Sequence, residues 1–189
     1  YDKTLKLGLH KWSEKDDFSI HHFRNIVMVA SELKELDWLE NFINKFSAEL
    51  APADRDNMIN YTFALLNYER KEYEKALENI LKIKINFPHY KLDIKNLMFK
   101  IYYDMNLPEQ AFSILEAIRQ YIPNARELPE VHKRKSKNFV RFAKRLLRLK
   151  SSHLRNTLDL FEKDFAKENI IGSREWLLQK VKELKYTKF

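Results

Sequence analysis

Apolar residues recur along most of this chain at spacings of three and four, the period of a helix with one buried face. In the first such stretch Ile26, Val29 and Leu33 follow this spacing, and Phe139, Phe142 and their neighbours follow it later. The pattern predicts an all-α fold of about nine helices, at residues 19–35, 37–50, 54–68, 72–86, 91–104, 108–121, 129–150, 154–165 and 173–184.

The glycine content supports a helical fold. The chain has only two glycines, Gly8 and Gly172, where average usage of about 7% would give about thirteen. Turn-rich β folds and phosphate-binding loops depend on glycine for positive φ and for close approach of the backbone. Gly172 is placed to end the eighth helix, and Ser173 is a suitable N-cap for the ninth.

A spacing of 35 residues relates two segments in the middle of the chain. Ala76 has a small residue, Ala64, twelve positions before it and Pro88 twelve positions after it. A shift of 35 leads from Ala76 to Ala111, which has Pro123 twelve positions after it. Small side chains let two helix backbones approach, and proline cannot continue a helix, so the spacing predicts helix pairs.

This spacing resembles the tetratricopeptide repeat, in which each repeat is a pair of antiparallel helices. The resemblance implies an α-solenoid over residues 1–128, with clear repeats at about 54–125 and a degenerate repeat at about 19–52. Residues 129–189 would form a helical region that packs on the array and caps it. Phe99 departs from the pattern because it stands where the second clear repeat should have a small residue.

The resemblance also implies a binding groove. In this family the first helix of each repeat lines a concave surface. The matching positions in this chain hold amide, aromatic, methionine and lysine side chains, a mixture that suits a peptide. Phe63 stands where carboxylate-binding members have a lysine, so a carboxylate clamp is not expected. In the alternative, the same residues pack against an adjoining protein segment. The matching positions are Asn60, Phe63, Asn67, Lys95, Met98 and Tyr102.

Positive charge is concentrated in one segment. The chain has a net charge of +8, yet residues 131–155 hold ten lysines and arginines and no acidic residue. One face of the predicted helix could bind the phosphates of a nucleic acid, or it could be solvated or paired with acidic residues such as Glu109, Glu116 or Glu127. The cations of that face are Lys137, Arg141, Lys144, Arg145 and Arg148.

No known catalytic, cofactor-binding or metal-binding motif is present. The absence of cysteine excludes disulfides and thiol chemistry and favours a reducing compartment, so we expect a cytoplasmic protein. No run approaches the ~18 apolar residues of a membrane span. Because the chain begins at Tyr1, we expect a processed protein or a fragment. These observations predict a non-enzymatic scaffold without cofactor that binds a protein or peptide, with nucleic-acid binding as the alternative.

Overall fold

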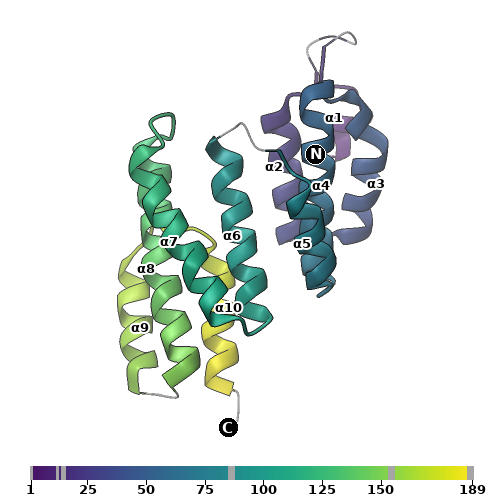
Figure 1. Ribbon diagram of the computed structural model, residues 1–189. Coiled ribbons are helices and arrows are strands. Elements are labelled where there is room, and N and C mark those ends of the chain that lie inside the picture. Colours follow the sequence, from purple (N-terminus) through teal and green to yellow (C-terminus); the bar gives the residue numbers. More distant parts are fainter. Residues whose placement is uncertain (1, 12, 14–15, 85–87, 153–155, 187–189) are drawn as a thin grey trace. The chain divides into compact units, whose positions relative to one another are not determined.

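The computed structural model describes residues 2–11, 13, 16–84, 88–152 and 156–186 (Figure 1). These residues form ten α-helices, a short 3-10 helix and no strand, which confirms the predicted all-α class. The helix that the apolar pattern did not predict is α1, a short helix near the N-terminus. The helices are α1 (Asp2–Lys6), α2 (Ile20–Glu32), α3 (Leu36–Phe46), α4 (Pro52–Glu69), α5 (Tyr73–Leu81), α6 (Pro88–Asp104), α7 (Pro108–Asn124), α8 (Glu130–Ser152), α9 (Asn156–Lys167) and α10 (Arg174–Tyr186).

The chain divides into two compact units, Tyr1–Asn86 and Phe87–Phe189, here called unit 1 and unit 2. The sequence led us to expect a change of organisation after residue 128 instead. In the structure α6 and α7 share one core with the helices that follow them, from Leu92 on α6 to Val181 on α10. The helices assigned to the second repeat therefore belong to the same unit as the C-terminal helices.

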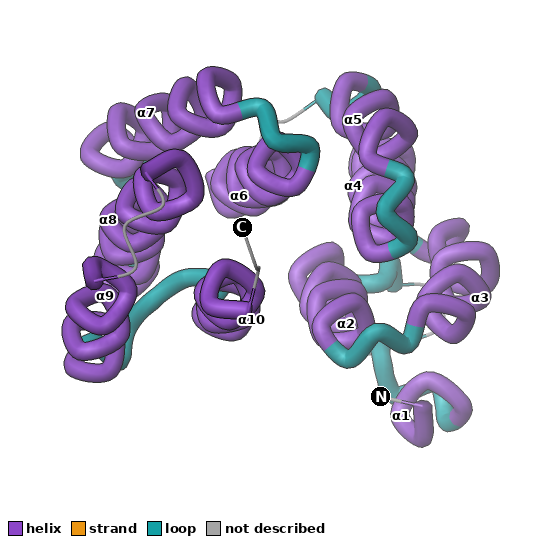
Figure 2. Tube along the Cα trace, turned by 90° about the horizontal axis from the view of Figure 1, so that it is seen from below, coloured by secondary structure: helices purple, strands orange, loops and turns teal. Residues whose placement is uncertain are grey.

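In unit 1 neighbouring helices pack against one another, α2 on α3, α3 on α4 and α4 on α5, and α2 also contacts α4 (Figure 2). The buried face of α2 differs from the predicted one. Val29 and Leu33 are 38% and 69% exposed, whereas Phe23 and Ala30 are buried with Ile26. The three-four spacing fits both sets of residues, and contact with α3 and α4 selects the set that includes the aromatic ring.

The segment before α2 is held to unit 1 by His10. Its imidazole lies 4.6 Å from the ring of Phe18 and 5.4 Å from that of Phe46, measured between ring centroids. The Nε2 atom of His10 and the ammonium group of Lys11 each lie 2.9 Å from a carboxylate oxygen of Glu49. Aromatic packing and this shared carboxylate together fix residues 10 and 11 on the unit.

The small residues of the repeat and Pro123 lie where expected, but Pro88 does not. Ala64, Ala76 and Ala111 are fully buried, as expected for helices in close contact. Pro88 begins α6 instead of ending α5, which already ends at Leu81. Pro123 is the second-last residue of α7. Proline is favoured in the first turn of a helix, where its missing N–H has no partner to lose, so an equal spacing serves two different helix ends here.

Helix α8 is the centre of unit 2 and contacts α7, α9 and α10, while α6 packs on α7 (Figure 2). Of the predicted stripe of α8, Phe139, Phe142, Ala143 and Leu146 are buried, and Leu149 is partly buried against the same core. Leu158, Phe161 and Phe165 of α9 are also buried; Leu154 lies outside the described residues.

Phe99 shows why the second repeat departs from the pattern. Its ring is fully buried and lies 5.6 Å from the ring of Phe139 on α8 and 5.7 Å from that of Trp176 on α10. A small residue at this position would leave a cavity between α6 and the C-terminal helices. The large side chain is therefore adapted to contacts outside the repeat.

Gly172 does not end the preceding helix, because α9 already ends at Lys167; it lies in the connection between α9 and α10, directly against α8. Its N–H donates to the carbonyl oxygen of Lys135 over 3.1 Å. A Cβ atom at this position would lie 3.2 Å from the Cβ of Phe139, closer than carbon atoms normally pack. The glycine thus permits a close approach, and Ser173 precedes α10 with a φ of 48°, unlike the extended backbone of most N-caps.

Candidate binding surfaces

The predicted peptide groove draws its residues from both units. On α4 of unit 1, Asn60, Phe63 and Asn67 share one face of the helix and are half-buried. The side-chain amide of Asn60 donates to the carbonyl of Asp56 over 2.8 Å, so part of its hydrogen-bonding capacity is used within the helix. Each half-buried side chain still presents some surface to a partner.

The other three groove residues lie on α6 of unit 2. Lys95, Met98 and Tyr102 also share a helix face and are half-buried. Tyr102 packs against the core of unit 2, which favours a structural role for this ring. That all six residues line one surface stays a prediction, because three of them belong to each unit.

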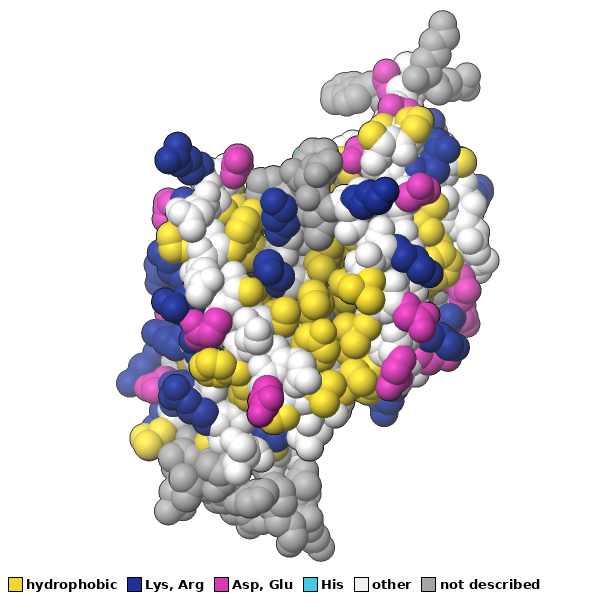
Figure 3. Space-filling model, in the orientation of Figure 1, with side chains coloured by type: hydrophobic (Ala, Val, Ile, Leu, Met, Phe, Trp, Pro, Cys, Tyr) yellow, Lys and Arg dark blue, Asp and Glu magenta, His cyan; other side chains and the backbone are white. Residues whose placement is uncertain are grey.

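Along α8, cations point in alternation toward two neighbouring helices. Lys137 and Lys144 lie on the side of α7, whereas Arg134 and Arg145 reach residues at the C-terminal side of α9. In Figure 3, lysine and arginine side chains gather along the left edge, over α8 and α9. The basic segment is therefore not one uniform face.

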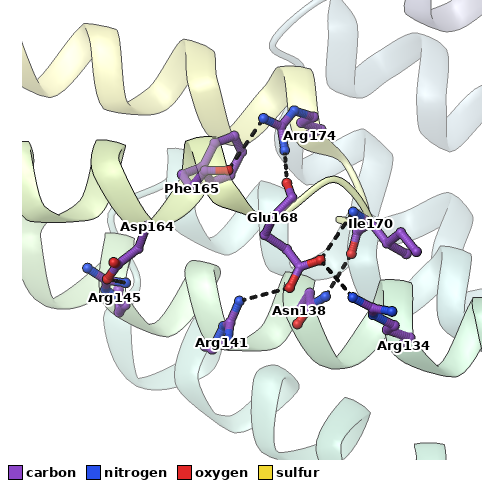
Figure 4. A network of polar contacts seen from close by, with 9 residues as sticks. All are labelled: Arg134, Asn138, Arg141, Arg145, Asp164, Phe165, Glu168, Ile170 and Arg174. Carbon is purple, nitrogen blue, oxygen red and sulfur yellow. Dashed lines mark hydrogen bonds and ion pairs between the residues drawn. The ribbon is translucent and has the colours of Figure 1, made fainter.

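Glu168, which follows α9, is the centre of the contacts on the α9 side (Figure 4). Its two carboxylate oxygens each accept a hydrogen bond of 3.4 Å, one from Arg134 and one from Arg141. Burial alone would raise the pKa of Glu168, but the backbone N–H of Ile170 and the two arginines outweigh it and hold the pKa below its ordinary value. The carboxylate is thus ionised at neutral pH and ties α8 to the end of α9.

Three more groups complete this network (Figure 4). Arg145 donates to Asp164 over 2.9 Å, and the side-chain amide of Asn138 donates to the carbonyl of Ile170 over 2.8 Å. Arg174 of α10 donates to the carbonyls of Phe165 and Glu168, over 3.4 and 2.5 Å. A guanidinium at these carbonyls satisfies acceptors that the end of α9 leaves free, and its charge complements the helix dipole.

On the α7 side, Glu116 lies between two cations. Its carboxylate accepts hydrogen bonds from Lys144 and, over 2.7 Å, from Nε of Arg119. Hydrogen bonds from Lys144 and Arg119 lower the pKa of Glu116 below its ordinary value. The ammonium group of Lys144 also lies 5.4 Å from the centre of the Phe112 ring, which is 44% exposed.

The structure therefore answers the question that the basic helix raised. Three of the five predicted cations, Arg141, Lys144 and Arg145, have acidic partners within the chain. The other two, Lys137 and Arg148, are exposed and form no ion pair with the described residues. Glu116 was among the expected partners. Asp164 and Glu168 were not, because the sequence does not show that α9 lies beside α8.

A groove of about 380 Å³ lies between α7 and α8. Aliphatic side chains form its floor, and cations from both helices surround them. The floor consists of Ile122, Pro123 and Val140, and the cations are Arg119, Lys137, Arg141 and Lys144. This arrangement can hold an apolar group and one or more negative charges together. Sequence analysis identified three of the four cations but did not place them beside an apolar floor.

The two units carry opposite net charges. Unit 2 contains 22 lysines and arginines and 12 acidic residues, a net charge of +10, whereas unit 1 contains 13 and 15, a net charge of −2. The groove between α7 and α8 therefore lies in a positive field, which attracts anionic partners over roughly one Debye length, ~8 Å at physiological salt.

Other kinds of site receive no support in the part of the chain that the structure describes. These residues contain no group of three or more histidine, aspartate or glutamate side chains arranged to hold a metal ion. No described helix is both long and apolar enough to cross a membrane. Searches of protein-family models, curated proteins and solved structures find no match to this chain.

Proposed function

We propose that this chain is a non-enzymatic binding module that holds a segment of another protein in the groove between α7 and α8. The fold we propose for it is an array related to tetratricopeptide repeats, supported by the neighbouring helix pairs and by the buried small residues Ala64, Ala76 and Ala111. Arrays of helix pairs commonly serve as binding surfaces, because successive pairs extend a surface without changing the core.

One observation carries the choice of surface, namely the combination of an apolar floor with a cationic rim. Protein segments supply apolar side chains and carboxylates within a few residues of each other, which this groove can receive together. Lys137 on its rim has no ion pair with the described residues, so its charge is available to a partner. The half-buried faces of α4 and α6, with Asn60 and Lys95, remain a second candidate surface for the same function.

Nucleic-acid binding is the alternative, and the net charge of +10 on unit 2 favours it. A polyanion would respond to the whole field and would bind with an affinity that falls steeply as salt rises. It would draw on exposed cations wherever they lie, including Arg148, which does not line the groove. The two functions therefore differ in how they depend on individual cations.

Two charge reversals separate these functions. Lys137→Glu removes a cation from the groove, and Arg148→Glu makes the same charge change on the same helix, about 16 Å away at a rise of 1.5 Å per residue. Peptides selected on the intact chain from a random library, and a fluorescent single-stranded oligonucleotide, serve as the two probes. Binding is measured by fluorescence anisotropy at several salt concentrations.

For a protein-binding groove we expect Lys137→Glu to weaken peptide binding about tenfold and Arg148→Glu to change it less than about twofold. Equal losses for both variants would show that the groove is not the site. Nucleic-acid binding is the correct function if three results occur together: the oligonucleotide binds, both reversals weaken its binding equally, and no peptide is selected. Circular dichroism of each variant confirms that the helices are retained.

A further inference from the structure

Glu116 shows what chemistry fits the rim of the groove. Its carboxylate is held between Arg119 of the same helix and Lys144 of α8, both of which line the groove. Lys144 is only 20% exposed, so its ammonium group depends on nearby acceptors more than a solvated lysine does. The spacing of the two cations is therefore already matched to a single carboxylate.

The floor indicates what must accompany that carboxylate. Pro123 is an exposed aliphatic side chain beside Ile122 and Val140, which belong to the buried core, and the exposed Phe112 ring lies one helical turn before Glu116. Aliphatic and aromatic side chains of a peptide would cover this surface and remove it from water. A single-stranded nucleic acid prefers several aromatic rings for stacking, and this floor contains none.

We infer that the groove recognises an acidic protein segment with an apolar anchor, and that a carboxylate of this segment replaces Glu116 between Arg119 and Lys144. The inference rests on the proposed function and defines the chemistry of its partner. In the free protein Glu116 occupies the anion position and competes with the partner. The apolar anchor lies on Pro123, beside the buried Ile122 and Val140, and a second carboxylate pairs with Lys137.

The competition gives an unusual expectation for a binding surface, since removing one of its residues should improve binding. Glu116→Gln keeps the shape and a hydrogen-bond acceptor but removes the charge that competes with a ligand carboxylate. Arg119 and Lys144 then become available to the ligand without the cost of displacing an ion pair. A matched control is Glu109→Gln, the same change at an exposed position in the first turn of α7.

Three synthetic peptides of equal length serve as probes. The first has a leucine flanked on both sides by glutamates, the second has glutamines in place of the glutamates, and the third has serine in place of the leucine. Each peptide is titrated with the intact chain and with the Glu116→Gln and Glu109→Gln variants. Dissociation constants come from fluorescence anisotropy at a fixed, moderate salt concentration, and circular dichroism checks the fold of each variant.

We expect Glu116→Gln to tighten binding of the leucine–glutamate peptide about threefold to tenfold, and Glu109→Gln to change it less than about twofold. The glutamine and serine peptides should bind weakly to all three proteins. Equal tightening in both variants would reveal only a long-range field and would overturn the inference. Unchanged or weaker binding of the peptide to the Glu116→Gln variant would also overturn the inference. In that case, binding of the acidic peptide to the unmodified chain would leave the proposed function intact. No binding of any peptide to any protein would overturn both.

Discussion

Replacing Asp104 with asparagine should break the most buried ion pair among the described residues. Nζ of Lys180 on α10 lies 2.7 Å from a carboxylate oxygen of Asp104 on α6, and the two side chains are only 13% and 9% exposed. Lys180 also contacts Glu183, which is 49% exposed, at 3.0 Å. A second ammonium, that of Lys150 on α8, donates to the backbone carbonyl of Tyr103, next to Asp104.

The magnitude follows from what the substitution leaves behind. Breaking a buried ion pair by removing one partner typically costs about 3–5 kcal/mol, because the other charge stays buried without compensation. Glu183 still offers Lys180 a partly solvated partner, so we expect a loss of about 3 kcal/mol in the free energy of unfolding of unit 2. Lys180→Met removes the charge itself and should cost less, and the double variant should show a coupling of about 1–2 kcal/mol.

Fluorescence of Trp176 is a suitable assay, since its ring lies 5.3 Å from that of Tyr103 and 5.8 Å from the ammonium group of Lys180. With Trp12 and Trp38 replaced by phenylalanine, urea unfolding of the intact chain reports on unit 2 alone. A loss below about 1 kcal/mol for Asp104→Asn, or additive single variants, would refute the argument that this pair joins α6 to α10.

The same pair predicts a dependence on pH. Burial alone would lower the pKa of Lys180, but Asp104 and Glu183 outweigh it and raise the pKa above 10.5. The stabilisation by this lysine is therefore complete below about pH 10.5 and is lost as the pH rises through the higher folded-state pKa. Burial lowers the pKa of Lys150, so the effect of Lys150 on stability changes with pH in the opposite direction to that of Lys180. The cost of Asp104→Asn should accordingly shrink in alkaline solution.

Three further substitutions, one of them with a matched control, test the packing and the N-terminal contacts. Gly172→Leu should lower the free energy of unfolding by about 2–3 kcal/mol in urea titrations, because its side chain would meet the backbone and core of α8. Ala111→Arg should cost more than about 4 kcal/mol or prevent folding, whereas Ser113→Arg, exposed on the same helix, should cost less than about 0.5 kcal/mol. Burial alone would raise the pKa of Glu49, but hydrogen bonds from Lys11 and His10 outweigh it and lower the pKa. The contribution of Glu49 to stability is therefore present above about pH 4.5 and lost in acid. Glu49→Gln should therefore flatten the acid side of the stability profile of unit 1, measured by circular dichroism.

The helices were predictable to the extent that a single buried face determined them. Helix α8 is buried along one stripe and exposed along another, and its predicted extent and core residues agree with the structure. Helix α2 carries apolar residues on more than one face, so spacing alone selected Val29 and Leu33 wrongly. Pro88 illustrates a second limit, because one residue type serves both the start and the end of helices.

The candidate site was predictable in its charges and not in its neighbours. The run of cations identified Lys137, Lys144 and Arg141, and Glu116 was foreseen as a partner because the repeat placed it on the preceding helix. The contact of Arg141 with Glu168 depends on how α9 folds back along α8, which no periodicity encodes. The apolar floor of the groove likewise results from the pairing of two helices.

The cations of α8 differ in what they contact, and this difference separates stability from binding. Arg134, Arg141 and Arg145 pair with carboxylates on the α9 side, and two of them also lie over aromatic rings. Arg141 lines the groove as well. Planar guanidinium groups suit such contacts because they can stack on an aromatic ring and at the same time donate hydrogen bonds in the plane of the guanidinium. Lys137 and Lys144 face the groove, where a lysine ammonium, whose hydrogen-bond geometry is less restricted than that of a guanidinium, can exchange one carboxylate for another. Reversing the charge of Arg145, which does not line the groove, should therefore reduce stability more than binding, and reversing that of Lys137 should reduce binding with little effect on stability.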